Sequence, residues 1–231
     1  MAGFQTIINA CDAISIDRRK VVGIQFTRNE EPRTTQTPTL NPWKFTITVP
    51  NSFRYNDARS LIEALDHLDR ITPEIISFGA NPRANWIFRY QGTMSTNQIT
   101  NITVSSFIGT TLTLTNLPAI PASRVLFQPN DLIQIGTIDE HPFPFTSVNQ
   151  VLRGTGSTVT VETNRPNIIT SSVVGSGIIV GTNCQFKVFS PNMPTYKLYP
   201  GGYQKINNTV VNNAYIEWSD DFILYEYVAD A

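Results

Sequence analysis

The sequence predicts a mainly β protein with one principal α-helix and a small all-β module inserted into its body. Short runs of alternating apolar and polar residues recur between turns rich in Gly, Pro and Asn. A single stretch, at about residues 56–71, has apolar residues at helical spacing. Only 15% of the 231 residues are charged and 41% are hydrophobic, which excludes a disordered tail and leaves enough apolar surface for a core.

Two strands joined by a long protruding loop are expected near the N-terminus. In the first strand, Val22, Ile24 and Phe26 fall on one face. The run WKFTITVP, residues 43–50, alternates in the same way. Residues 29–42 between them are polar and include three prolines. A loop of this length is usually functional or disordered, and we interpret it as an arm that orders against a neighbouring subunit.

The helix is expected within YNDARSLIEALDHLDRIT. Asn56 or Asp57 can cap its N-terminus, and Pro73 ends it. The apolar stripe of this helix consists of Leu61, Ile62, Leu65 and Leu68. The segment ANWIFRYQG, residues 84–92, is interpreted as another strand.

From about residue 97 the apolar runs become shorter and the turn residues between them more frequent. Stretches such as ITNITVSSFIGTTLTLTNL and STVTVETNRP are short β runs separated by Gly, Pro and Asn. We interpret residues 97–169 as a small β-barrel or β-sandwich module of about five strands. Residues 1–96 and 170–231 then form one β domain that contains the helix. The module is an insertion, which requires only that its two ends lie close together.

The closing stretch YIEWSDDFILYEYV, residues 215–228, contains adjacent carboxylates in the middle of an apolar strand. In a regular strand Asp220 would share a face with Trp218 and Phe222, and an isolated buried carboxylate is costly. We therefore expect a bulge or turn at Asp220 and Asp221, because Asp side chains readily bond nearby backbone N–H groups. The pair is interpreted as an interruption of the strand, not as a catalytic or metal pair.

No residue pattern in the sequence supports an enzyme, a cofactor or a metal site. A hydrolytic triad or a zinc site needs several ligands at workable spacing, and this chain has only His67 and His141 as histidines. Consecutive Asp139, Glu140 and His141 rarely converge on one ion, so a flexible polar loop is favoured. The glycines of GTGS and GSGIIVG lack the Lys-Ser/Thr of a phosphate loop. We predict no catalytic residues, no cofactor and no metal.

Cys11 and Cys184 are predicted to be free, buried thiols. The N-terminus lacks the continuous apolar stretch of a signal peptide, so we expect synthesis in a reducing cytoplasm. No run approaches the roughly 20 apolar residues of a membrane span, and we expect no membrane association.

The only concentrated charge lies at residues 17–20, DRRK. Three basic residues without a stacking platform are a weak signal for nucleic acid, so we expect no sequence-specific nucleic-acid binding. A solvated turn or a patch of ion pairs between subunits fits so short a charge run better. Together with the charges of the arm, the candidate intersubunit contacts are Arg18, Arg19, Lys20, Glu30, Glu31 and Arg33.

Several stretches resemble virion structural proteins of tailed bacteriophages, including phages of cyanobacteria. The most recognisable are FQPNDLIQIG, QVLRGTGSTVTVETNRP and the ending MPTYKLYP with IEWSDDFILYE. They resemble small distal-tail or baseplate-hub proteins of the tail-tube type, over nearly the whole chain. The chain departs from that pattern at LDRITPEIISF, where relatives have glycine-rich turns, which leaves the end of the helix open.

The resemblance implies a tail-tube-like β-sandwich or barrel without catalytic residues. It further implies a homo-oligomeric ring, hexameric, at the distal end of the tail tube. Such a ring would dock other tube, baseplate or fibre proteins and surround a channel through which DNA can pass. The implied localisation is the virion tail, after synthesis in the host cytoplasm.

Other functions remain open at this point. A neck or tail-terminator ring protein belongs to the same structural class at the opposite end of the tail. A carbohydrate-binding tail-tip module would use Trp43, Trp86 and Trp218 to stack on sugars, although all three fall in expected strands, where core packing is commoner. A tail enzyme is the least favoured, because the chain offers no acid–base or metal set.

Overall fold

The computed structural model describes residues 3–18, 22–26, 32–36, 42–49, 53–67, 72–136, 141–191, 193–199, 203–206, 209–212 and 214–228. The predicted mainly β class is confirmed: strands in several antiparallel sheets make up most of the regular structure. No closed barrel occurs among the described residues. The buried apolar side chains form separate hydrophobic cores, one in the body and one in the module.

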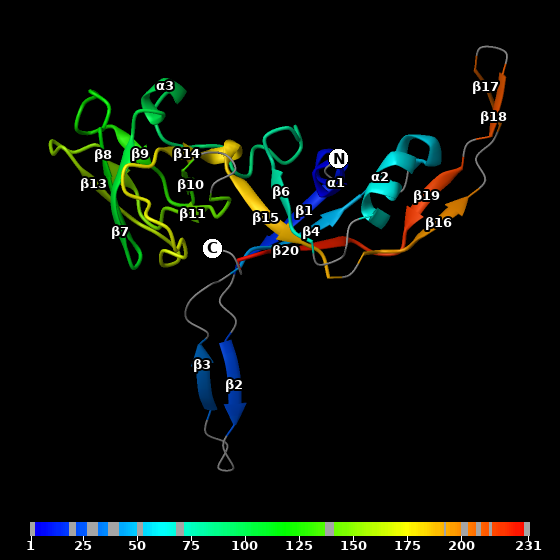
Figure 1. Cartoon of the computed structure of the whole chain (residues 1–231), viewed down its shortest axis with the longest axis horizontal. Helices are drawn as coiled ribbons and strands as arrows, with labels where there is room; N and C mark the ends of the chain where they lie inside the picture. The colour runs from blue at the N-terminus through cyan, green and yellow to red at the C-terminus, as the bar shows by residue number, and fades with distance from the viewer. Residues whose placement is uncertain are drawn as a thin grey trace.

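A five-stranded antiparallel sheet is the centre of the body (Figure 1). Apolar and polar residues alternate along its strands, which buries Phe45 and Ile47 on the same face as their partners Leu224 and Phe222. Segments from both ends of the chain therefore build one core. In spatial order the strands are β1 (Ala13–Asp17), β4 (Lys44–Thr48), β20 (Phe222–Glu226), β15 (Gln185–Phe189) and β6 (Glu74–Ser77).

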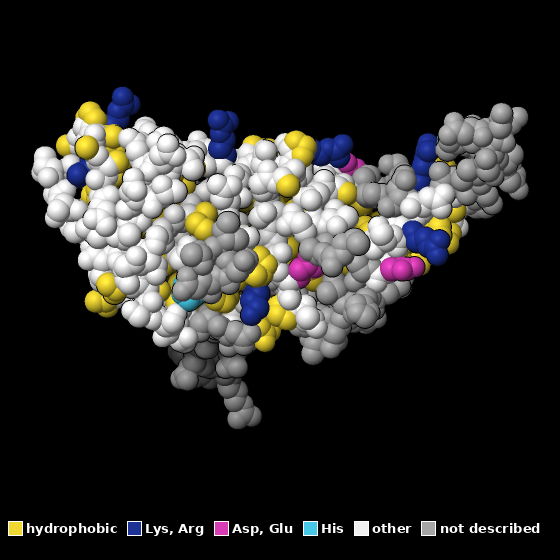
Figure 2. All heavy atoms as spheres, turned by 45° about the horizontal axis from the view of Figure 1, so that its top comes forward, with side chains coloured by type: hydrophobic (Ala, Val, Ile, Leu, Met, Phe, Trp, Pro, Cys, Tyr) yellow, Lys and Arg dark blue, Asp and Glu magenta, His cyan; other side chains and the backbone are white. Residues whose placement is uncertain are grey.

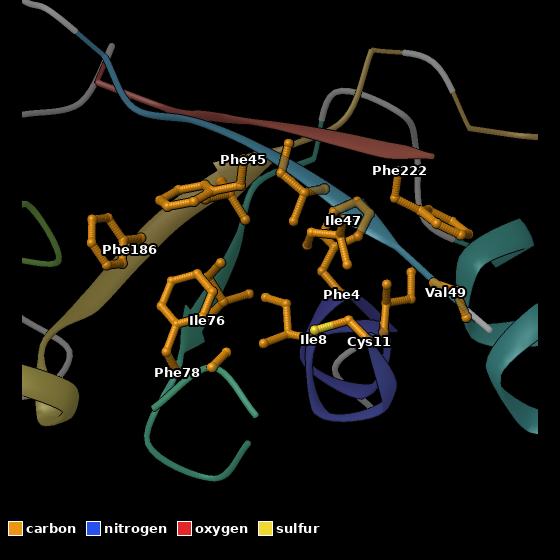
Figure 3. Packing of buried hydrophobic residues seen from close by; sticks show 14 of the residues in the cluster. Phe4, Ile8, Cys11, Phe45, Ile47, Val49, Ile76, Phe78, Phe186 and Phe222 are labelled. Carbon is orange, nitrogen blue, oxygen red and sulfur yellow. The ribbon is translucent and has the colours of Figure 1, made fainter. Parts of the chain in front are cut away.

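Helix α1 (Gly3–Ala10) packs on the apolar face of this sheet and was not expected from the sequence. Figure 3 shows Phe4 and Ile8 of α1 lying among the apolar side chains of the sheet. The carboxylate of Glu74 accepts the backbone N–H of Phe4 at 3.0 Å. The Gln5 side chain accepts the N–H of Ser77 at 2.8 Å and donates to the Ser77 carbonyl at 2.9 Å. Helix α1 thus covers the free edge of β6.

Helix α2 (Tyr55–His67) is the principal helix that the sequence predicts. Leu61, Ile62 and Leu65 of its expected apolar stripe are buried in the core of the body. Residues 68–71 of the expected helix, including Leu68, lie outside the described residues.

The second hydrophobic core extends from Met94 to Val180, and the segment that contains it is called the module. That the module is an insertion at residues 97–169 remains a prediction. Strand β10 lies between the two cores: Leu132 belongs to the core of the body, whereas Ile133 and Ile135 belong to that of the module. The sheets of the module are β13-β8-β7, β11-β10-β14 and β12-β9. Their bounds are β7 (Thr103–Ile108), β8 (Thr111–Thr115), β9 (Val125–Phe127), β10 (Leu132–Ile135), β11 (Phe145–Thr146), β12 (Val151–Leu152), β13 (Val159–Glu162) and β14 (Ile178–Val180). Short helical turns flank them, α3 (Thr96–Ile99) and η1 (Gly181–Asn183).

The N-terminal loop differs from the expectation. Strand β2 (Val22–Phe26) does not join the main sheet but pairs with β3 (Pro32–Gln36), which lies inside the segment expected to be an irregular loop. Strand β1, which the sequence did not predict, pairs with β4 in the main sheet. The β2–β3 hairpin extends away from the main sheet (Figure 1).

A further sheet, β16-β19-β5, lies beside α2 and continues into a second projecting hairpin (Figure 1). Its strands are β16 (Tyr196–Tyr199), β19 (Tyr215–Trp218) and β5 (Phe53–Arg54). The hairpin, which the sequence did not predict, pairs β17 (Tyr203–Ile206) with β18 (Thr209–Asn212).

The prediction of a strand at residues 84–92 is wrong, because this segment forms turns and no strand. The Asn81 carbonyl accepts the N–H of Asn85 at 2.8 Å, and the Ala84 carbonyl accepts that of Ile87 at 3.1 Å. Trp86 is consequently 67% exposed instead of lying in a strand, and its Nε1 donates to the Arg83 carbonyl at 2.7 Å.

The interruption expected in the closing stretch is confirmed. Strands β19 and β20 are separated at Ser219–Asp221 and belong to different sheets. Asp220 and Asp221 are exposed, whereas Trp218 and Phe222 on either side of them are buried. The pair therefore lies at the point where the chain passes from one sheet to the other.

Candidate assembly site

Arg18 is the one predicted contact residue whose side chain the structure describes, and it lies between the body and the module. It follows β1, and its Nη1 donates to Thr146 Oγ1 of β11 at 3.1 Å. Its Nη2 donates to Asn130 Oδ1. The guanidinium carbon lies 5.3 Å from the centroid of the Trp43 ring, within the range of a cation–π contact. Burial lowers the pKa of Arg18, because removal of water disfavours its charged form.

The other candidate contacts cannot be placed in the same way. Arg19, Lys20, Glu30 and Glu31 lie outside the described residues. Arg33 lies in β3, of which only the backbone is described. The structure therefore brings Arg18 to the junction with the module and leaves the expected intersubunit role of all six residues a prediction.

A cavity of about 310 Å³ lies beside Arg18. The module residues that line this cavity were not predicted from the sequence, because they come from separate segments of the module. The cavity is lined by Arg18, Pro129, Asn130, Thr146, Ser147, Val148 and Asn164.

A buried ion pair also joins the module to the body. Arg165 of the module and Glu226 of β20 are 1% and 3% exposed. Arg165 Nη1 and Nη2 each donate to a different Glu226 carboxylate oxygen at 2.7 Å. Glu226 Oε2 also accepts the backbone N–H of Trp43 at 3.1 Å, and Arg165 Nη2 donates to the Pro144 carbonyl at 2.8 Å. Because the two charged groups are buried and bind each other through two directed bonds, this pair fixes how the module meets the sheet.

The sheet β16-β19-β5 presents an apolar surface and a strand edge. Strand β16 pairs with β19 on one side and with no other described strand. Leu198 and Tyr199 of β16 and Tyr215 of β19 are exposed, and Tyr199 and Tyr215 lie directly opposite each other. Exposed apolar side chains at an unpaired edge are typical of a surface that another chain covers.

A smaller cavity of about 230 Å³ lies between α2 and this sheet. Its lining includes Ile62 and Leu65 of α2, Met193 and Tyr196, and Trp218 of β19. The indole Nε1 of Trp218 is buried without a hydrogen-bond partner.

The candidate metal-ligating side chains do not gather among the described residues. No group of three or more His, Cys, Asp or Glu among them could hold a metal ion. His141 Nε2 lies 3.3 Å from Ser171 Oγ, and Asp139 and Glu140 lie outside the described residues. Both cysteines are free and buried, as predicted.

Among the described residues on the face seen in Figure 2, Lys and Arg side chains stand apart from one another. No helix in the described part of the chain is long and apolar enough to cross a membrane.

Comparison with known proteins adds no relative to this picture. A scan against protein-family models finds no match, and a search of curated proteins finds none either. The arguments below therefore rest on the residues and their geometry.

Proposed function

We propose that the chain is a non-enzymatic structural subunit of a bacteriophage tail. In this proposal it forms a homo-oligomeric ring at the distal tube or baseplate hub and docks other baseplate or fibre proteins. The stretches FQPNDLIQIG and IEWSDDFILYE, which resemble such proteins, suggest the class. The projecting hairpins and the exposed strand edge support an assembly role.

The observation that carries the proposal is the isolation of the hairpins. Among the described strands, β2 and β3 pair only with each other, and so do β17 and β18. A lone two-stranded hairpin is marginally stable in water, so each hairpin gains stability when another surface covers it. A closed ring needs two different surfaces on each subunit, and projecting elements at separate places on the body supply them.

Strand β16 supports the same role. Its unpaired edge can accept a further strand through backbone hydrogen bonds, a common mode of protein association. The exposed Leu198, Tyr199 and Tyr215 would add apolar contact area to that interaction.

The test is cryo-electron microscopy of an intact particle that contains this chain. The expected result is density for the chain in a ring at the distal end of the tail tube. Density at the neck would support the alternative of a neck or tail-terminator ring. Absence from the particle would overturn both structural proposals.

A pair of variants tests the contribution of the β2–β3 hairpin. Residues 22–36 are replaced by a short Gly-Ser linker, and incorporation of the chain into particles is measured. The expected result is a folded protein, shown by an unchanged urea midpoint, that no longer enters particles. The control is Ile108→Thr, which removes an exposed apolar side chain of the module and should assemble normally. Normal assembly without the hairpin would contradict its role.

Carbohydrate binding is the second candidate, and one observation favours it. Trp86 is 67% exposed on a surface turn, where an indole ring can stack on a sugar. A glycan array tests this function: binding that is lost in Trp86→Ala and kept in Tyr215→Ala would support it. Failure of the wild-type chain to bind any glycan would contradict a carbohydrate-binding function.

A further inference from the structure

We propose that the cavity beside Arg18 is a binding site for an oxyanion, either a carboxylate or a phosphate. This inference concerns the single chain and does not depend on ring assembly. It rests on three features of the cavity: a cation held in place, no carboxylate paired with that cation among the described residues, and side-chain N–H and O–H donors that are still available.

The Arg18 guanidinium is held from two sides. Thr146 and Asn130 accept its hydrogen bonds, and the Trp43 ring lies 5.3 Å from its centre. An Arg side chain has five N–H donors, and only some of them are used in these bonds. The cation is therefore fixed before any ligand arrives, which lowers the entropic cost of binding.

The partners of this half-buried cation are neutral. The described residues place no carboxylate in an ion pair with Arg18. Glu226, on the other side of Trp43, is occupied by Arg165. Asp131 follows Asn130, but its carboxylate accepts backbone N–H groups of Gln91 and Gln128 at 2.8 Å each. A partly desolvated cation without a counterion is unfavourable, so an incoming anion would be stabilised.

Three of the remaining polar side chains around the cavity already accept a hydrogen bond. Asn130 Oδ1 and Thr146 Oγ1 accept from Arg18, and Asn164 Oδ1 accepts the backbone N–H of Thr146 at 2.8 Å. The two amide Nδ2 groups and the Thr146 hydroxyl hydrogen are left as donors. Donors grouped around a guanidinium suit a ligand with several acceptor oxygens and a negative charge.

The backbone at Asn130 is consistent with a built site. Its φ is 73°, in the left-handed region that non-glycine residues rarely occupy. This conformation is held by the bond from the Asn130 N–H to the Ser147 carbonyl at 2.8 Å. Asn adopts this conformation more readily than most non-glycine residues, and the bond keeps it at the edge of the cavity.

The experiment is an NMR titration of the intact ¹⁵N-labelled chain with sodium acetate and, separately, sodium phosphate, at constant ionic strength set with sodium chloride. The expected result is saturable shifts at the side-chain amides of Asn130 and Asn164 and at the backbone amides of residues 146–148. Tighter binding of acetate would assign the site to an Asp or Glu side chain of a partner. Tighter binding of phosphate would assign it to a phosphate group.

Matched variants make the titration decisive. Arg18→Gln should weaken binding at least about tenfold, because the charge and the fork of donors are lost. Arg89→Gln removes an exposed guanidinium at a different cavity and should leave binding unchanged.

Asn130→Asp preserves the acceptor for Arg18 and supplies an internal counterion, so it should keep the fold and abolish anion binding. Absence of saturation in the wild-type chain, or equal binding in Asn130→Asp, would overturn the proposal.

Discussion

Arg165 and Glu226, which are 61 positions apart in the chain, form a doubly hydrogen-bonded ion pair that is almost completely buried. The backbone N–H of Glu226 donates to the Trp43 carbonyl, and the Glu226 carboxylate accepts the backbone N–H of Trp43. The Arg165 guanidinium carbon lies 5.2 Å from the centroid of the Phe145 ring. The pair therefore connects the last strand of the body to the interior of the module. Its stabilisation depends on both partners being present, because each alone would be an unpaired charge without water.

Removal of one partner of this pair should be strongly destabilising. Arg165→Met and Glu226→Gln are each expected to lower the free energy of unfolding by about 3–5 kcal/mol, because each leaves an uncompensated buried group. The double variant Arg165→Met/Glu226→Met should cost less than the sum of the two single changes. Urea unfolding measures all three.

The control for these three variants is the exposed pair Arg83–Asp12, whose side chains are 62% and 45% exposed. Arg83→Met should cost less than about 1 kcal/mol, as is usual for surface ion pairs. A cost of similar size for Arg165→Met would show that the buried pair does not hold the junction together.

Asp131 should make stability depend on pH in the direction opposite to a salt-bridged carboxylate. Burial raises the pKa of Asp131, although backbone N–H groups of Gln128 and Gln91 oppose the shift. The folded state thus binds the proton more tightly than the unfolded state. The charged Asp131 therefore lowers the free energy of unfolding. This destabilisation is absent below the unfolded pKa of about 3.9 and fully present above the raised folded pKa.

The free energy of unfolding of the wild type, minus that of Asp131→Asn, should therefore fall as the pH rises from about 4. Urea titrations of both proteins at several pH values give this difference directly. A difference that is constant or rises with pH would contradict the raised pKa.

Local patterns were sufficient for much of the fold. The alternation in β4, the apolar stripe of α2 and the interruption at Asp220 all depend on neighbouring residues, and each could be predicted from the sequence. Helix α1 could not, because it has only eight residues and is held by Glu74, 70 positions from Phe4. Apolar and polar residues alternate in segment 84–92 as they do in a strand. The N–H groups of Ala84 and Asn85 nevertheless donate to the Asn81 carbonyl, and the segment forms turns instead.

The candidate site was predicted only in part, for the same reason. Arg18 was identified because it lies in a short run of charge. Nothing in the sequence around Asn130, Thr146 or Asn164 indicates that they meet, because the sheet pairing of the module brings them together. Arg165, near the end of the expected β run STVTVETNRP, has no local signal for burial.

The cysteines should be unreactive in the folded protein. Cys11 and Cys184 are each 1% exposed, and burial raises the pKa of both thiols. The reactive thiolate is therefore scarce at neutral pH, and reagents cannot reach the sulfur atoms. Ellman's reagent should label both thiols only after unfolding in urea. The exposed Ser105→Cys variant is the positive control, and rapid labelling of the native wild type would contradict the buried positions.

Gly181 should not tolerate a side chain, because its backbone and its surroundings both exclude one. Its φ is 67°, and an added Cβ would lie 2.8 Å from the backbone nitrogen of Tyr90. Gly109 is the matched control: its φ is 57°, and an added Cβ would meet no atom within 4 Å. Gly109→Ala therefore carries only the cost of the left-handed conformation, about 1 kcal/mol. Gly181→Ala adds overpacking against the segment that leads into the module, for a total of about 2–5 kcal/mol. Urea unfolding of both variants measures the difference, and equal costs would show that η1 does not press on residues 88–90.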